Sequence, residues 1–140
     1  MSTIESSLTR RQALRGPALV GAMGLTTAGL LHFHDPHDSG AYGFCPFLLI
    51  TGRPCPGCGG LRAINDLTRF EFGAAVSSNV LAVALVIVLA AAYVFWVARR
   101  WRGQDKPMIV LGSKAGIAVV VLLVVFGVVR NTPWGSWLAP

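Results

Sequence analysis

The feature that most constrains this chain is an uncharged stretch at residues 80–98, which reads VLAVALVIVLAAAYVFWVA. A helix needs about 20 mostly apolar residues to cross the hydrocarbon core of a bilayer, and this stretch meets that requirement. Residues 16–33 contain no Lys, Arg, Asp or Glu, and residues 108–129 contain Lys114 near one end, where its long side chain can reach the headgroups. The sequence therefore predicts an all-α integral membrane protein with about three transmembrane helices.

The composition agrees with a membrane protein and argues against a nucleic-acid partner. Hydrophobic residues make up 54% of the chain and charged residues only 13%, too few to cover a soluble domain. The net charge of +6 comes from Lys and Arg that flank the apolar segments instead of forming one polar face. Flanking basic residues set membrane topology, so we expect the lipid bilayer to be the partner and no nucleic acid to bind.

The distribution of Lys and Arg predicts the orientation, because the cytoplasmic side of a membrane protein carries the excess. We expect a multi-pass protein of the plasma membrane, with the N-terminal segment 1–15 and the linker 99–107 in the cytoplasm. Segments 34–79 and 130–140 are then extracytoplasmic. The basic residues on the first side are Arg10, Arg11, Arg15, Arg99, Arg100, Arg102, Lys106 and Lys114, and those on the second are Arg53, Arg62, Arg69 and Arg130.

The start of the chain allows a second interpretation. Arg10 and Arg11 precede a short apolar run, which resembles a twin-arginine export signal. A cleaved signal should end in a small-x-small site, and TTAGLLHFHD offers a poor one. We therefore expect an uncleaved helix, and in both cases the residues after Leu31 lie outside.

The extracytoplasmic segment 34–79 has two predicted parts. The first is dense in Pro and Gly and predicts turns. The second, residues 61–70, has the helical period and predicts a short amphipathic helix, either lying along the membrane interface or packed on the outer ends of the spans. Its polar side comprises Arg62, Asn65, Asp66 and Arg69, with Arg62 and Asp66 spaced for mutual support, and its apolar side comprises Ala63, Ile64, Leu67 and Phe70.

The chemistry-bearing residues of this segment are Cys45, Cys55 and Cys58, with His34 and His37 upstream. A structural disulfide suits the oxidising compartment and would leave one thiol over. A zinc site is the second interpretation: Cys55 and Cys58 converge across the Pro-Gly turn, Cys45 is a third ligand, and His34 or His37 is the fourth. Thiol–disulfide exchange by the CPGC pair and free thiols without chemistry are the other two. These four alternatives stay open.

Several short motifs follow one another in the segment 45–82. They are Cys45-Pro46, Thr51-Gly52, Cys55-Pro56-Gly57-Cys58-Gly59, Arg62-Ala63 and Asn79. In this order they resemble a family of small bacterial membrane proteins, expected to be actinobacterial, known mainly as a domain of unknown function, and Arg130-Asn131 resembles the family's ending. The sequence departs from the family at Gly60-Leu61, where a Thr before the Arg is usual, and at Val80, where Pro is common. The resemblance implies a membrane location and a structured cysteine loop, and it supplies no activity.

Two classes of function follow. The favoured class is a non-enzymatic accessory or assembly subunit of a larger membrane complex, for example a respiratory assembly, because no carboxylate or His pair inside the spans marks a transport path. The alternative is a thiol-redox or metal-binding protein that uses the CPGC motif on the outer face, with zinc as the candidate cofactor. No residue is assigned a catalytic role.

Overall fold

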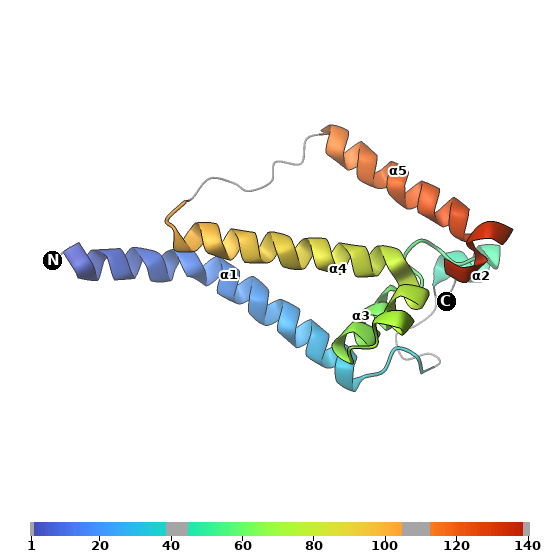
Figure 1. Cartoon of the computed structure of the whole chain (residues 1–140), viewed down its shortest axis with the longest axis horizontal. Helices are drawn as coiled ribbons and strands as arrows, with labels where there is room; N and C mark the ends of the chain where they lie inside the picture. The colour runs from blue at the N-terminus through green and yellow to red at the C-terminus, as the bar shows by residue number, and fades with distance from the viewer. Residues whose placement is uncertain (1, 39–44, 105–112, 139–140) are drawn as a thin grey trace.

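The computed structural model describes residues 2–38, 45–104 and 113–138, which form helices joined by turns. Figure 1 shows the three long helices running along the molecule, while the short helices gather at one end, far from the N-terminus. We call this the cysteine end, because Cys45, Cys55 and Cys58 belong to it. The helices are α1 (Ser2–Phe33), α2 (Pro46–Thr51), α3 (Gly60–Thr68), α4 (Phe72–Trp101), α5 (Ser113–Arg130) and the 3₁₀ helix η1 (Pro133–Leu138).

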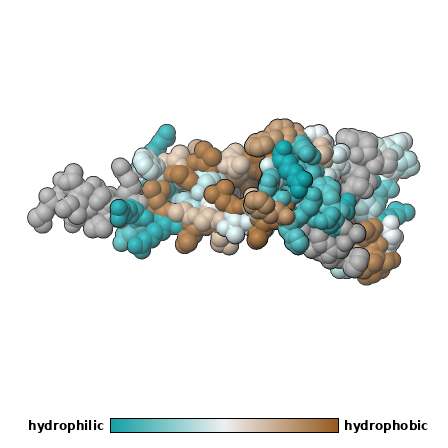
Figure 2. All heavy atoms as spheres, turned by 90° about the horizontal axis from the view of Figure 1, so that it is seen from below, coloured by the Kyte–Doolittle hydropathy of each residue, from teal (hydrophilic) through white to brown (hydrophobic). Residues whose placement is uncertain are grey.

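Two of the helices are long and apolar enough to cross a membrane. They are Arg11–Phe33 within α1 and Phe72–Trp101, the whole of α4, in agreement with the predicted spans 16–33 and 80–98. Only 11% and 6% of their most apolar windows are buried inside the chain, so most of their apolar surface faces outward. Figure 2 shows these hydrophobic residues along the middle of the molecule, with hydrophilic ones towards both ends. This distribution suits a membrane location.

The third predicted span, 108–129, begins outside the described residues, and the rest of it lies in α5. A third membrane crossing therefore stays a prediction. Helix α1 begins at Ser2 and continues to Phe33, so it includes most of the predicted segment 1–15 as well as the first predicted span, and the boundary between the two stays a prediction.

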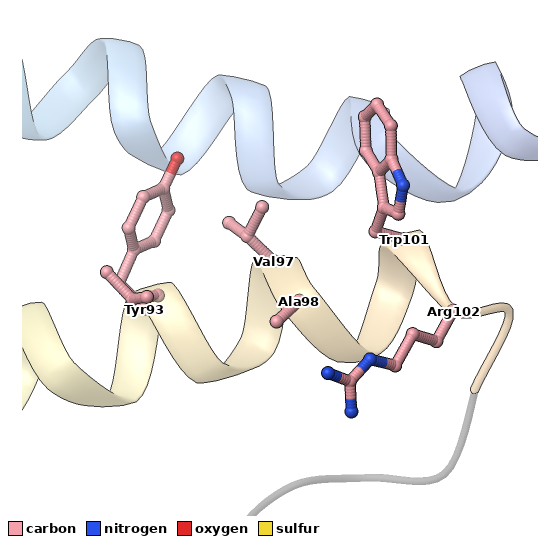
Figure 3. A pocket seen from close by; sticks show the side chains of 6 residues that line it. Tyr93, Val97, Ala98, Trp101 and Arg102 are labelled. Atoms are coloured by element: carbon pink, nitrogen blue, oxygen red, sulfur yellow. The ribbon is translucent and has the colours of Figure 1, made fainter.

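Helices α1 and α4 meet away from the cysteine end. The hydroxyl of Tyr93 donates a hydrogen bond to the carbonyl oxygen of Pro17 at 3.0 Å, and a Cβ at Gly21 would overlap that hydroxyl. Figure 3 shows Tyr93 and Trp101 pointing from α4 towards α1. The cavity of about 460 Å³ drawn there is lined by Tyr93, Val94, Val97, Ala98, Trp101 and Arg102.

At the cysteine end, α3 packs against both α4 and α1, which matches the second of the two placements considered for the amphipathic helix. The side chain of Ala63 in α3 is buried, together with those of Ala75 and Val83 in α4. Small side chains let these helices approach closely, and a Cβ at Gly60 would just touch the Cβ of Ala82. The buried core is small and lies at the cysteine end, with Val83 inside the predicted span 80–98 and Ala63 and Ala75 outside it.

The polar side of α3 is buried as well as the apolar side, which differs from the predicted amphipathic helix. Asn65 and Asp66 are 1% and 2% exposed. The Asn65 amide donates to the carbonyl of Leu31 at 2.6 Å, and the Ser78 hydroxyl donates to the Asp66 carboxylate at 2.9 Å. Phe70, assigned to the apolar side, is 79% exposed, because a left-handed backbone (φ 63°) ends the helix there.

Candidate metal centre

The structure brings the three cysteine sulfurs together. The Sγ atoms of Cys45, Cys55 and Cys58 all lie within 4.8 Å of one another, and the three residues are half-buried. Those of Cys55 and Cys58 are 3.1 Å apart, and all three thiols are free. A disulfide requires about 2.05 Å, so this pair is in non-bonded contact. Three thiols at one point are the donor set of a thiophilic metal ion.

Cys45 reaches this point because it precedes α2 directly. It is the N-cap of that helix, and Pro46 occupies the first helical position, where its missing N–H costs nothing. Thr51 and Gly52 end the helix. The Thr51 hydroxyl donates to the carbonyl of Phe47, and Gly52 adopts the left-handed conformation (φ 67°) that suits a residue without a Cβ.

Cys55 and Cys58 are joined by a tight turn through Pro56 and Gly57. The backbone N–H of Cys58 donates to the carbonyl of Cys55 at 3.1 Å, and the N–H of Cys55 donates to the sulfur of Cys58 at 3.2 Å. Gly59 follows in the left-handed conformation (φ 79°) and is the N-cap of α3. A side chain at Gly59 would strain that backbone, so the glycine is required for α3 to start next to Cys58.

Asn79 connects the cysteine turn to α4. Its backbone is extended (φ −168°, ψ 98°) and breaks the helix, and its side-chain oxygen accepts the N–H of Ala82 as an N-cap does. Its side-chain amide donates to the carbonyls of Pro56 and Cys58, both at 3.0 Å. The residue that starts the apolar stretch 80–98 therefore also fixes the cysteine turn.

Arg130 and Asn131 approach the same turn from the end of α5. The Nη1 atom of Arg130 donates to the carbonyls of Cys55 and Cys58 at 3.1 and 2.8 Å, and Nη2 donates to that of Ser78 at 3.4 Å. The Asn131 amide donates to the carbonyl of Pro54 at 3.0 Å. The site therefore joins residues that are separated by 72 to 77 positions in the sequence.

The environment of Arg130 is unusual for a charged residue. It is 1% exposed, and its Nε has no hydrogen-bond partner. The ion pairs of the described residues join Asp35 or Asp66 to His37 or Arg69, and none includes Arg130. Burial lowers the pKa of Arg130, and the charges of Cys58 and Cys55 oppose that effect. A buried cation generally needs a nearby anion, and thiolates at Cys55 and Cys58, whose carbonyls Arg130 bonds, would supply one.

The thiols have different acidities. Hydrogen bonds, first from the backbone N–H of Leu48 and then from Cys55 and Cys58, lower the pKa of Cys45 from 9.0 to about 7. Burial, followed by the hydrogen bonds with Cys55 and Cys45, raises the pKa of Cys58 from 9.0 to about 12. Without a metal ion, the group therefore holds its first negative charge at Cys45.

Three predicted site residues lie elsewhere. His37 contacts two carboxylates: its Nδ1 lies 2.8 Å from Asp35 and its Nε2 lies 3.4 Å from Asp66. Its backbone N–H and its ring lower the pKa of Asp35. His34 is outside the sulfur group of the described residues and lies just past the end of α1. Arg62 donates from Nε to the carbonyl of Pro36 at 3.3 Å and does not reach the cysteine turn.

One contributor was missed by the sequence reasoning. A Cβ at Gly127 would lie 2.9 Å from Cγ of Pro56, so the absence of a side chain there lets α5 rest on the cysteine turn. The signal was a glycine within an otherwise bulky run, VVFGVVR, a pattern that often marks close helix packing in membranes.

Comparison with known proteins gives one match. Residues 45–93 match the model of a family described as "Protein of unknown function (DUF2752)". No curated protein and no solved structure matches the chain. The matched segment contains the three cysteines and Asn79 but ends before α5. The match confirms the predicted resemblance: residues 45–93 of this chain are similar to a family of unknown function.

Proposed function

We propose that the chain is a multi-pass membrane protein that binds one zinc-class metal ion through Cys45, Cys55 and Cys58 on the extracytoplasmic side. A tetrahedral site with Zn–S bonds of about 2.3 Å separates its sulfurs by about 3.8 Å. The sulfurs lie within 4.8 Å of one another, with one pair at 3.1 Å, so small side-chain rotations bring them to that spacing. Soft thiolates favour zinc over magnesium or calcium.

The observation that carries this proposal is the buried guanidinium of Arg130 behind the cysteine turn. A divalent ion with three thiolates has one net negative charge, which the single positive charge of Arg130 balances. The guanidinium also holds the carbonyls of Cys55 and Cys58, so it orients the two ligands that it neutralises. Residues that orient metal ligands in this way usually matter nearly as much as the ligands.

The membrane arrangement is part of the proposal. Helix α5 provides the third span, and its 18 residues reach about 27 Å, close to the thickness of the hydrocarbon core. The N-terminus lies in the cytoplasm and the C-terminus outside, because Arg99, Arg100 and Arg102 lie at the end of α4 that is opposite the cysteines.

The metal content of purified protein tests the site. We expect one zinc ion per chain in mild detergent, and less than one tenth of that amount in Cys45→Ser, Cys55→Ser and Cys58→Ser. His37→Ala is the matched control, since His37 contacts Asp35 and Asp66, and it should keep the full metal content. Metal-free wild-type protein with three reactive thiols would overturn the proposal, as would a Cys55–Cys58 disulfide, the outcome expected of a thiol-redox protein.

For the cellular role we propose a non-enzymatic accessory or assembly subunit of a larger membrane complex. The support is α2, whose Phe47, Leu49 and Ile50 are 49%, 69% and 84% exposed next to the metal ligand Cys45. Exposed apolar residues beside an ordered site are typical of a protein contact. We expect Ile50→Asp to abolish co-purification with partner proteins while the zinc content is kept. Loss of zinc together with the partners would contradict a separate contact surface.

A further inference from the structure

The described residues supply three ligands to the metal centre, one fewer than a closed zinc site needs. Within the part of the chain that the structure describes, the group of neighbouring His, Cys, Asp and Glu side chains at this site comprises Cys45, Cys55 and Cys58. Residues 39–44, which precede Cys45, read SGAYGF and contain none of these four residue types. Structural zinc sites have four protein ligands, whereas sites that bind a water or substrate have three.

The histidines and carboxylates nearest in sequence have other contacts. His32 shares a 3.0 Å hydrogen bond with the hydroxyl of Thr68, and His37 lies between the carboxylates of Asp35 and Asp66. Asp66 is buried and accepts a hydrogen bond from Ser78. Moving either histidine to the sulfurs would break these contacts, so these described residues are not arranged to close the site.

Space and positive charge lie beside the turn. A cavity of about 510 Å³ borders it, with Pro54 and Pro56 on both sides of Cys55 and with Arg53 and Phe47 in its wall. Arg130 bonds the backbone carbonyls of Cys55 and Cys58 and not their sulfurs, and the sulfurs are half-buried, so a ligand can still reach them. An anion there would be attracted by both the metal ion and the Arg53 guanidinium.

We infer that the metal ion keeps an open fourth position that binds a small exogenous anion, with Arg53 as an attracting residue. This inference rests on the proposed metal site. The centre is then a ligand-binding site and not merely a staple of the loop. A water molecule completes the coordination when no anion is bound.

The experiment uses full-length protein in detergent, loaded with Co²⁺ in place of zinc and titrated with azide. We expect the visible cobalt bands to change and to saturate at one azide per cobalt. The azide dissociation constant should rise about two- to fivefold in Arg53→Gln, the range of one partly exposed charge contact, and stay unchanged in the control Arg69→Gln. X-ray absorption of the zinc form should give three sulfurs and one oxygen.

The outcomes separate this inference from the metal site itself. Cobalt that binds with bands indifferent to azide, or a zinc spectrum with a histidine or fourth protein ligand, overturns the open position and leaves the metal site standing. An azide affinity unchanged by Arg53→Gln overturns the role of Arg53. Failure of the wild-type protein to bind cobalt or zinc overturns the proposed function and this inference with it.

Discussion

Arg130 determines how the cysteine turn is held. Its guanidinium is buried and bonds to carbonyl oxygens of Cys55, Cys58 and Ser78, none of which carries a charge. Hydrogen bonds from a charged donor contribute about 1.5–3 kcal/mol each, and a carbonyl that loses its buried partner costs about 1–3 kcal/mol. The residue therefore acts on the geometry of the turn and, in our proposal, on the charge of the metal centre.

We expect Arg130→Gln to weaken zinc binding by about tenfold to a hundredfold, which is what about 1.4–2.8 kcal/mol implies. Arg130→Lys should lose less zinc affinity, because lysine keeps the positive charge but lacks the forked guanidinium. Competition with a chromophoric chelator measures both affinities. The control is Arg69→Gln, whose contact with Asp35 is partly exposed and which should change affinity by less than about fivefold. Equal affinities for wild type and Arg130→Gln would remove Arg130 from the site.

The cysteines should also differ in reactivity once the metal is removed. Because the pKa of Cys45 is lowered to about 7, its thiolate stabilises the folded state fully above about pH 9, and this contribution is lost as the pH falls through 7. Cys58, with its pKa raised to about 12, stays protonated at neutral pH. Iodoacetamide should therefore modify Cys45 before Cys58, with a midpoint near pH 7. Peptide mass mapping that finds Cys58 modified first contradicts this order.

The sequence indicated which residues meet at the cysteine turn better than it indicated which contacts the nearby histidines make. The cysteines, Asn79, Arg130 and Asn131 were all singled out, and they meet at one turn. The histidines were considered as ligands because they are near in sequence. His37 instead lies between Asp35 and Asp66, whose two carboxylates attract its ring more directly than neutral thiols do. Whether a histidine contacts the carboxylates or the thiols depends on distances in space, which the spacing of residues along the chain does not give.

Among the helices, α5 has a defined contact with the cysteine turn through Gly127 and Pro56. We expect Gly127→Val to push α5 off the turn, because a Cβ there already meets the proline ring at 2.9 Å. Arg130 and Asn131 lie just after Gly127 at the end of α5 and would move away with it, so the zinc affinity should also fall. Gly116→Val is the matched control, since open space surrounds that position, and it should bind zinc as wild type does. Similar affinities for both variants would show that α5 does not support the site.

The short helix α3 shows where periodicity was informative and where it was not. The helical period placed a helix at residues 61–70, and the structure has one at Gly60–Thr68. The period alone did not identify the buried side, because an amphipathic pattern assumes that polar residues face water. Asn65 and Asp66 are buried because Leu31 of α1 and Ser78 of α4 provide hydrogen-bond partners, which the period of α3 itself does not reveal.

At the scale of the whole molecule, the long helices have little contact with one another and a largely exposed apolar surface. The buried core and most long-range hydrogen bonds lie at the cysteine end, where the short helices gather (Figure 1), and the bond between Tyr93 and Pro17 joins α1 to α4 elsewhere. Lipid satisfies apolar side chains as well as a protein core does, so spanning helices can stay loosely packed. For this reason the apolar stretches could be predicted from composition alone. The packing at the cysteine end could not, because it depends on contacts between residues far apart in the sequence.

The proposed orientation predicts which compartment reaches the cysteines. After chelation and reduction, a membrane-impermeant maleimide added to intact cells should label the native thiols. For the control, these thiols are first blocked from outside in Gln104→Cys, and the introduced thiol should then react only after the membrane is opened. Gln104 is exposed and follows α4 at the opposite end of the molecule. Labelling of the introduced thiol in intact cells would reverse the topology.

The central claim is that three cysteines at one end of a membrane protein hold one metal ion, and native mass spectrometry of the detergent-released chain tests it most directly. We predict the mass of one chain plus one zinc ion, less the protons that the thiols lose on binding, and a return to the chain mass after acid or chelator. Cys55→Ser should give the metal-free mass from the start. A wild-type chain at its own mass, or lighter by the two hydrogens of a disulfide, would contradict the account.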